Sequence, residues 1–255
     1  MLIAYAVVGA LLALIWAQRL IEAAFGMRTL ADITKPEWAA FPPQMRAPRL
    51  SIIVPALNEE QHIEEAITSL LNLDYPDYEV IAVNDRSTDR TGEIMERLAA
   101  SAVGKLRVLH VRELPPGWLG KPHAMWLAAQ QAGGQWFLFT DADVKFRPDA
   151  LRRAVHYAES SVTDHLAVIP TMEMKTAGER MMIAYIQCMS LFATFRFWKA
   201  PDPKSSEYVG VGAFNLIRRS VYEKLGSFAA LRMEVVEDLK LGKLVKQHGF
   251  AQRVA

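Results

Sequence analysis

An apolar run ends in two carboxylates at Trp136-Phe137-Leu138-Phe139-Thr140-Asp141-Ala142-Asp143. A short apolar run that stops at turn residues is typical of a buried strand. Side chains at positions i and i+2 of an extended segment point to the same side, so both acids can face one ligand. Two close carboxylates repel each other unless a cation lies nearby, and hard divalent cations prefer oxygen ligands. The motif predicts a cation site at a strand end; a strand followed by a solvated turn is the alternative when the motif is taken alone.

Further strands and helices alternate on both sides of this run. Periodicity predicts strands at 50–55, 78–84, 106–111, 136–140 and 166–170, and helices at 59–71, 91–100, 121–131, 148–160, 219–225 and 237–248. This alternation predicts an α/β fold with an open, mainly parallel sheet and helices on both faces. Ligands of such sheets bind beyond the carboxyl ends of the strands. Asn58, Asp85 and Asp143 each follow a strand, so we expect them at one rim, with Asn58 also capping the helix at 59–71.

Two loops carry groups that suit a nucleotide. Asp85, after the second strand, can accept hydrogen bonds from a base or ribose, while Asp89 is expected to cap the next helix. Lys121 follows Pro115-Pro116-Gly117-Trp118-Leu119-Gly120 at the start of a helix, where a positive charge favours phosphate. No Gly-x-Gly-x-x-Gly follows the first strand, and Lys121 lacks the glycine spacing of a Walker loop. The first of these absences argues against a nicotinamide or flavin oxidoreductase.

Glu237 and Asp238 open the last predicted helix. The helix dipole favours acids in a first turn, which is a sufficient reason for both residues. The alternative is that one of them is a general base. The residues alone leave the two explanations open.

Composition places limits on the partners and the size of the fold. The chain has 255 residues, 51% of them hydrophobic, which predicts either one large domain or one domain with an appendage. Its net charge of +1 gives no reason to expect a nucleic acid partner. Cys188 is the single cysteine, so no intrachain disulfide can form.

The first 25 residues form an apolar segment near the length of a membrane span. We expect a transmembrane anchor at 1–25, a proline-rich linker at 26–49 and a globular domain at 50–255; a signal peptide or a buried helix are the alternatives for the first segment. Basic residues lie at its end and beyond it, and by the positive-inside tendency we expect the domain in the cytoplasm: Arg19, Arg28, Lys35, Arg46 and Arg49. Met181–Trp198, rich in methionine and aromatic residues, is either a buried core helix or a helix in the membrane interface.

The order of these motifs resembles the family 2 inverting glycosyltransferases of the GT-A fold. The matching residues are Ile53-Val54-Pro55-Ala56-Leu57-Asn58-Glu59, Asn84-Asp85-Arg86-Ser87-Thr88-Asp89, Gly120-Lys121, Asp141-Ala142-Asp143 and Glu237-Asp238. The longer motifs at 116–124 and 211–219 are similar to those of a membrane-attached group that includes hopene-associated and ceramide glucosyltransferases. The Gln-x-x-Arg-Trp motif of processive polysaccharide synthases is absent. Relatives usually continue beyond the acidic motif, so the chain is either a fragment or an unusually short enzyme.

The resemblance implies an enzyme that uses a nucleotide-sugar donor, expected to be a UDP-sugar, a divalent metal, Mg²⁺ or Mn²⁺, and a lipid or membrane-associated acceptor. It implies that Pro55, Asn58 and Glu59 line the nucleotide and that Asp85 contacts its base or ribose. By the same resemblance Lys121 lies near the diphosphate, Asp141 contacts the donor and Asp143 binds the metal. Asp238 is then the base, with Glu237 supporting it. A nucleotidyltransferase that uses the same carboxylates and a non-catalytic membrane scaffold are the rival hypotheses.

Overall fold

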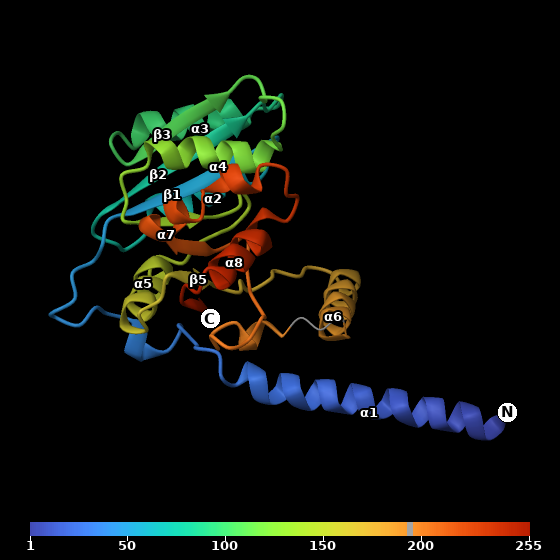
Figure 1. Cartoon of the computed structure of the whole chain (residues 1–255). Helices are drawn as coiled ribbons and strands as arrows, with labels where there is room; N and C mark the ends of the chain where they lie inside the picture. Colours follow the sequence, from blue (N-terminus) through green and yellow to red (C-terminus); the bar gives the residue numbers. More distant parts are fainter. Residues whose placement is uncertain (193–195) are drawn as a thin grey trace.

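Seven strands form one sheet in the computed structural model, which describes residues 1–192 and 196–255 (Figure 1). Their order across the sheet is β3-β2-β1-β4-β6-β5-β7. The strands are β1 (Leu50–Ala56), β2 (Tyr78–Asp85), β3 (Leu106–Val111), β4 (Trp136–Phe139), β5 (His165–Ala167), β6 (Asn215–Arg218) and β7 (Gln252–Val254). The mainly parallel sheet expected from the sequence is confirmed.

One strand runs against the others. β3, β2, β1 and β4 pair in parallel, as do β5 and β7, whereas β6 is antiparallel to both β4 and β5. An antiparallel strand begins at the rim where its parallel neighbours end. The loop that leads into β6 therefore reaches the same rim as the loops that leave β1, β2 and β4.

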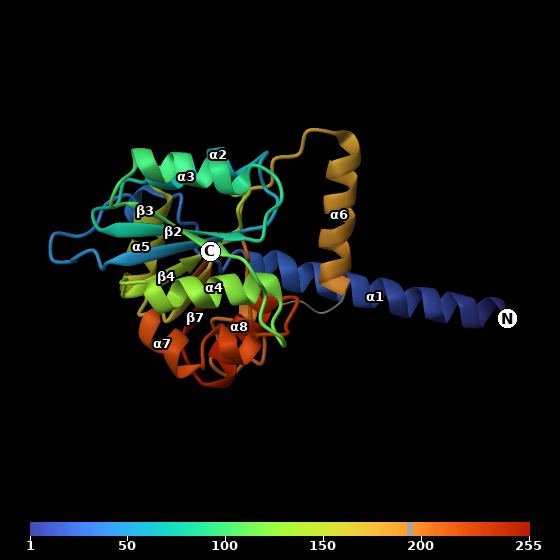
Figure 2. The ribbon, with the colours of Figure 1, turned by 90° about the horizontal axis from the view of Figure 1, so that it is seen from above.

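Helices cover both faces of this sheet, as predicted (Figure 2). Strand residues alternate between the two layers: Ile52 and Val54 pack with α2, α3 and α5, whereas Ile53 packs with α4, α7 and α8. The helices are α1 (Leu2–Met27), α2 (Ile63–Leu71), α3 (Thr91–Ser101), α4 (Gly120–Gln131), α5 (Ala150–Ser160), α6 (Ala177–Phe192), α7 (Arg219–Lys224) and α8 (Glu237–Gln247), with 3₁₀ turns at Pro36–Trp38, Phe197–Lys199 and Phe228–Leu231.

The helix predicted from residue 59 begins later, and its expected cap is wrong. Asn58 has a left-handed backbone, with φ of 57°, and His62 is the N-cap of α2. The Asn58 amide oxygen instead accepts a hydrogen bond from the Thr88 N–H at 2.8 Å. The chain turns at 59–62 before α2 starts, with the His62 N–H donating to the Glu59 carbonyl at 3.0 Å. Asn58 is therefore free to bind the loop after β2 and does not begin the helix. Likewise, the strand expected at 166–170 ends at Ala167.

Two exposed helices lie outside the α/β body (Figures 1 and 2). Within the part of the chain that the structure describes, α1 is the one helix long and apolar enough to cross a membrane, and none of its apolar 18-residue window is buried. The alternative of a buried helix is therefore wrong. α6 contacts α1 and exposes its apolar residues, with Met181 74% and Tyr185 61% exposed, so the buried-core alternative for 181–198 is wrong for 181–189. Trp198, at the far end of that segment, is buried at 7% exposed, and residues 193–195 lie outside the described ranges.

The segment after α1 is docked along α5. The Trp38 ring lies edge-on to His156 and Tyr157, with centroids 5.2 Å apart in both pairs. Arg153 of α5 donates hydrogen bonds to the carbonyls of Ile33, Thr34 and Lys35 at 3.3, 3.0 and 2.8 Å. These contacts fix the point at which α1 leaves the body.

Candidate active site

The loops after β1 and β2 are held together at the rim of the sheet. The Asn58 N–H donates to the Ser87 hydroxyl at 3.0 Å, and the Glu59 N–H donates to the Thr91 hydroxyl at 2.8 Å. The Asp89 carboxylate accepts the Thr91 N–H at 3.0 Å beside the start of α3, although the N-cap residue of that helix is Arg90 and not Asp89 as expected. The predicted convergence of these polar loops is confirmed. Pro55, by contrast, is buried within β1, so its side chain lies beneath the rim.

Asp85 lies at the end of β2 with its carboxylate already engaged. Both of its oxygens accept from the Arg86 guanidinium, at 2.8 and 3.0 Å, and the residue is only 3% exposed. Gly120, the first residue of α4, packs directly on it: a Cβ added there would lie 2.3 Å from the Asp85 carboxylate. The absence of a side chain at Gly120 therefore lets the amino end of α4 approach β2.

Lys121 lies between two carboxylates, and this is the strongest electrostatic feature of the site. Its ammonium is 2.6 Å from an Asp141 oxygen and 2.8 Å from a Glu237 oxygen. Burial alone would lower the pKa of Lys121, but the charges of Asp141 and Glu237 outweigh it and raise the pKa. The lysine thus joins three elements, α4, the end of β4 and α8. The sequence predicted Lys121 at the start of a helix, which α4 confirms, but it did not predict these two partners.

Asp143 is the carboxylate left without such a partner. It is exposed, and among the described residues it takes part in no hydrogen bond or ion pair. Glu59 lies across from it: burial, followed by the charge of Asp143, raises the pKa of the Glu59 carboxyl. A cation beside Asp143 would relieve this accumulation of negative charge.

The residues therefore fit a metal ion that is held by one or two carboxylates and whose remaining ligands would come from the substrate and water. No group of three His, Cys, Asp or Glu side chains arranged to hold a metal occurs in the described ranges. Mg²⁺ usually binds through one or two carboxylates together with substrate phosphates and water. Asp143, with Asp141 two residues earlier, supplies that smaller set.

The acidic pair at the start of α8 divides into two environments. Glu237 is 3% exposed and faces Lys121, whereas Asp238 is half-buried and one of its oxygens accepts the Leu239 N–H at 2.7 Å. Consecutive helical residues point about 100° apart, so the two acids cannot share one role. Asp238 and Asp141 line the same small hollow, in which Asn215 also lies.

A glycine-containing loop before β6 packs between the two acidic motifs, and its part in the site was not predicted. A Cβ on Gly210 would lie 2.0 Å from the Asp238 carbonyl oxygen, and one on Gly212 would lie 2.7 Å from the Asp141 carboxylate. The Thr140 hydroxyl also donates to the Ala213 carbonyl at 2.8 Å. Two glycines before an antiparallel strand were visible in the sequence, but nothing there indicated which motifs they would separate.

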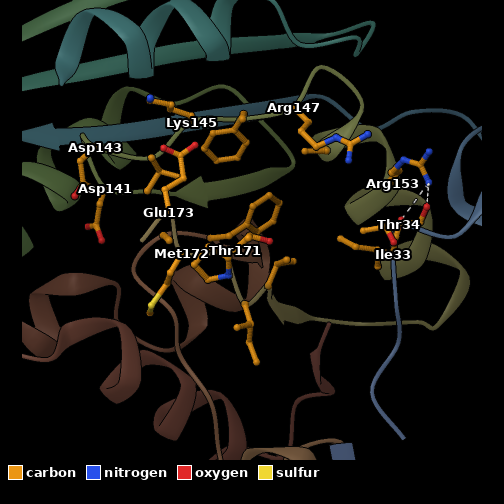
Figure 3. Close-up of a pocket in the computed structure, with 18 of the residues that line it drawn as sticks. Ile33, Thr34, Asp141, Asp143, Lys145, Arg147, Arg153, Thr171, Met172 and Glu173 are labelled. Carbon is orange, nitrogen blue, oxygen red and sulfur yellow. Dashed lines mark hydrogen bonds between the residues drawn. The ribbon is translucent and has the colours of Figure 1, made fainter. Parts of the chain in front are cut away.

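A large cleft opens beside the two aspartates (Figure 3). Its volume is about 850 Å³, within the range of small-molecule sites. It runs from Asp141 and Asp143 between the start of α5 and the segment at 168–174. Figure 3 shows Arg147 and Arg153 at the end remote from the aspartates, where Arg153 holds the segment that follows α1.

Comparison with known proteins agrees with this geometry. The family model for Glycosyl transferase family 2 matches residues 51–226. Poly(ribitol-phosphate) beta-N-acetylglucosaminyltransferase TarS of Staphylococcus aureus (strain Mu50) is 34% identical over 122 residues, which are 47% of this chain and 20% of TarS. The 4,4'-diaponeurosporenoate glycosyltransferase of Staphylococcus aureus (strain USA300) is 25% identical over 194 residues, 76% of this chain and 50% of that protein. The chain thus spans half or less of the length of these curated relatives.

Solved structures share the fold. The mannosyltransferase PcManGT from Pyrobaculum calidifontis, in complex with GDP-Man and Mn2+, superposes with a TM-score of 0.69 at 24% identity, covering 98% of this chain and 66% of that one. The TarS 1–349 structure in complex with UDP-GlcNAc gives 0.52 at 20% identity, covering 81% and 56%. From the family match and this fold, the chain belongs to Glycosyl transferase family 2 and has the GT-A fold.

Proposed function

We propose that this enzyme transfers a sugar from a UDP-sugar to a hydroxyl of a lipid acceptor, with inversion and with a divalent metal. One observation carries the proposal: Lys121 engages Asp141 and Glu237, while Asp143 beside them stays unpaired within the described residues. Each acid thus has a distinct chemical environment. Separate environments are what a single displacement requires, since one carboxylate must meet the donor and another must remain basic.

The donor half of the site lies at the carboxyl ends of β1, β2 and β4. Asn58, Glu59 and Asp85 would face the nucleoside, and Asp141 with Lys121 would face the diphosphate and sugar. Asp143 would hold Mg²⁺ or Mn²⁺, whose chemistry is to neutralise charge on the diphosphate leaving group. Neighbours solved with UDP-GlcNAc and with GDP-Man support a nucleotide-sugar donor, and the choice of uridine is the part open to direct test.

Asp238 is the proposed base. Its Oδ1 is engaged by the Leu239 N–H, which leaves Oδ2 to accept a proton from the acceptor hydroxyl. Glu237 is bound to Lys121 and would hold that lysine, and with it Asp141, in place. The acceptor oxygen attacks the anomeric carbon from the face opposite the diphosphate, so one displacement inverts the configuration without a covalent enzyme intermediate.

A membrane location accords with the two exposed helices. We expect α1 to span the bilayer and the catalytic domain to lie in the cytoplasm. Among the described residues of α1 the charged side chains are Arg19 and Glu22, which pair with each other at 3.4 Å, and Arg196 lies 3.6 Å from Glu22. Such a cluster suits the level of the lipid headgroups.

α6 would lie in the membrane interface beside this cluster. Thr176 and Glu179 form a reciprocal capping box at its start, with the Glu179 N–H donating to the Thr176 hydroxyl and the Thr176 N–H donating to the Glu179 carboxylate, both at 3.2 Å. A capped helix of 16 residues with little packing gains its stability from a partner surface. Its methionines and Tyr185 suit the apolar side of an interface.

Donor binding tests the proposed function. Titration of UDP and GDP into the full chain in detergent, with Mn²⁺ and with chelator, should give tighter binding of UDP and strong dependence on metal. Asp143→Ala should remove the metal dependence, whereas Asp149→Ala, an acid outside the proposed donor site, should keep it. Equal affinities in all these cases would refute the proposal. Exchange of label from pyrophosphate into the donor would favour the rival nucleotidyltransferase, and the lack of any nucleotide binding would favour a scaffold.

Membrane attachment has a separate test. Removal of residues 1–25 should release at least part of the protein from membranes, since it removes the apolar run of near-span length. Full retention of the shortened protein in high salt would assign the main attachment to α6, and the double change Met181→Glu with Tyr185→Glu should then release it.

A further inference from the structure

Three buried polar side chains lie on one face of the sheet, under α8. They are Asn215 on β6, His165 on β5 and Gln252 on β7, and each is at most 2% exposed. The register places His165 directly opposite both Gln252 and Ile217, and Asn215 lies two residues before Ile217, so all four side chains point to the same face. Ile217 belongs to the apolar layer that packs with α8. Polar groups buried in such a layer must be hydrogen-bonded, because they are costly otherwise.

The direction of each hydrogen bond in this trio follows from its partners. Gln252 Oε1 accepts the Val209 N–H at 2.9 Å, so its amide nitrogen faces the other way, where it lies 2.9 Å from His165 Nδ1. An amide nitrogen only donates, so Nδ1 accepts and the ring proton is on Nε2, which donates to Asn215 Oδ1. Burial lowers the pKa of His165 to about 4, which agrees with a neutral ring. The three side chains thus form one chain of hydrogen bonds.

Gln252 joins the two segments that carry Asp238. Its Nε2 donates to the Val209 carbonyl at 3.1 Å and to the Gly242 carbonyl of α8 at 3.0 Å. Those segments touch directly, since a Cβ on Gly242 would lie 1.8 Å from the Val209 carbonyl oxygen. Gly210, the next residue, packs on the Asp238 backbone, and Asp238 lies one helical turn before Gly242. One glutamine therefore fixes loop and helix within one residue and one turn of Asp238.

Asn215 extends this chain of hydrogen bonds to the rim. It lines the small hollow that Asp141 and Asp238 also line. The volume of the hollow is about 10 Å³, which is close to the least that holds one water molecule or one hydroxyl group. The hydrogen-bond chain from Gln252 thus ends in the wall of the hollow that contains the proposed base.

We propose that Gln252 and His165 are positioning residues, which hold Asp238 and Asn215 in the wall of the hollow without touching the substrate. The inference rests on the proposed function, in which Asp238 is the base, and adds the residues on which that base depends. A base acts only within hydrogen-bond reach of the proton that it removes. Asp238 lies in the first turn of α8, where the backbone N–H groups have no partner within the helix, so contacts from outside must restrain it.

Steady-state kinetics test the proposal. Release of UDP from UDP-glucose and from UDP-GlcNAc is measured for the full chain with Mn²⁺ in octyl glucoside micelles, where water and the detergent hydroxyls serve as acceptors. Gln252→Met keeps a side chain of similar length and removes its hydrogen bonds. Because a displacement of about 1 Å can cost about 10²-fold in rate, kcat should fall about 10- to 100-fold while KM for the donor stays within about twofold. Equal losses in kcat and in donor affinity would overturn the proposal.

A double variant separates positioning from a general loss of stability. If Gln252 acts through Asp238, Gln252→Met should slow the Asp238→Asn enzyme no further. Tyr78→Phe is the matched control: on the opposite layer it removes a buried hydroxyl that donates to the Leu70 and Leu71 carbonyls at 2.8 and 3.1 Å. It should lower the melting temperature and leave kcat unchanged. If Gln252→Met slowed the parent and the Asp238→Asn enzyme by the same factor, the positioning role would be refuted.

His165 provides a second route that remains open if Gln252→Met does not fold. His165→Leu removes both the donor and the acceptor and should lower kcat with little change in donor KM. His165→Gln has an amide with one group of each kind and should keep more of the rate. Equal rates in the two variants would show that the polar contacts of His165 do not matter for transfer.

Amide hydrogen exchange reports on the same anchoring without catalysis. Exchange over 236–242 should accelerate in Gln252→Met but not in Tyr78→Phe. If the parent releases no UDP, or if Asp238→Asn is as fast as the parent, the proposed function fails and this inference fails with it. If Asp238→Asn is slow while Gln252→Met matches the parent in both rate and exchange, the proposed function stands and the positioning role alone is refuted.

Discussion

Replacement of Lys121 by methionine tests the central ion cluster most directly. Methionine keeps an unbranched apolar stem and removes the ammonium, so Glu237 and Asp141 would face each other without a cation. The Glu237 side chain is 5% exposed, that of Asp141 36% and that of Lys121 41%. An exposed ion pair contributes about 0–1 kcal/mol, whereas removal of one partner of a buried pair costs about 3–5 kcal/mol. Because water reaches the lysine, we expect an intermediate loss of roughly 2–3 kcal/mol in the free energy of unfolding.

Lys145 provides a control of matched exposure. Its side chain is 45% exposed and its partner Glu65 is 64% exposed, at a distance of 2.7 Å. Lys145→Met should therefore cost at most about 1 kcal/mol. At about 2–4 °C per kcal/mol for a chain of this size, thermal unfolding in detergent should show Lys121→Met roughly 4–12 °C below the parent, and Lys145→Met within about 4 °C of it.

The pH dependence of the stability difference between Lys121→Met and the parent tests whether the lost ion pairs cause it. The raised pKa of Lys121 means that its contribution is complete below its unfolded value of 10.5 and is lost only as the pH rises above that value. The difference between Lys121→Met and the parent should thus be constant from about pH 7 to 9 and shrink in acid, where carboxylates take up protons. Addition of Glu237→Gln to Lys121→Met should restore part of the stability. If Lys121→Met were no less stable than Lys145→Met, the cluster would not hold α4, β4 and α8 together.

Three further substitutions each test one local feature of the structure. Asp238→Asn should slow sugar transfer by about 10²- to 10⁴-fold with little change in donor affinity; an equal loss of affinity would place Asp238 at the donor instead. His165 is fully buried, which lowers its pKa to about 4, so the unfolded state gains a proton first and stability should fall by up to about 3 kcal/mol between pH 7.5 and pH 4. His165→Gln should flatten that part of the denaturation profile, and an unchanged profile would contradict the assignment. Gly210→Ala must displace the backbone of Asp238, so both transfer and melting temperature should fall, and a variant equal to the parent in both would show that the contact gives way freely.

The rim at the carboxyl ends of β1, β2 and β4, which is the proposed donor half of the site, was predictable from sequence because its motifs are local. An apolar strand followed at once by polar residues places those residues at the rim whatever the rest of the fold, and Asp85 and Asp143 lie there. Asn58 was misassigned as a cap because its left-handed backbone responds to the loop after β2, which is 30 residues away in sequence. Local propensity carries no information about such a contact.

The second half of the site depended on contacts that no local pattern reveals. The antiparallel direction of β6 decides that Gly210 and Gly212 reach the rim, and a four-residue strand with two apolar residues carries no signal of its direction. The partners of Lys121 were equally hidden. Asp141 lies 20 positions further along the chain and Glu237 still further, so only the folded sheet brings their charges to one lysine.

The connection between β5 and β6 has a consequence for engineering. These strands are antiparallel neighbours, closed at the rim by the Val168 N–H to Phe214 carbonyl hydrogen bond at 3.1 Å, and the chain between them carries α6 and one wall of the cleft. Loop length adds little to the entropy of closing such a connection. Grafting the segment that corresponds to 169–208 from a relative, with Gly210 and Gly212 of the host left in place, should therefore change the acceptor preference while the preference for the donor nucleotide stays with the host.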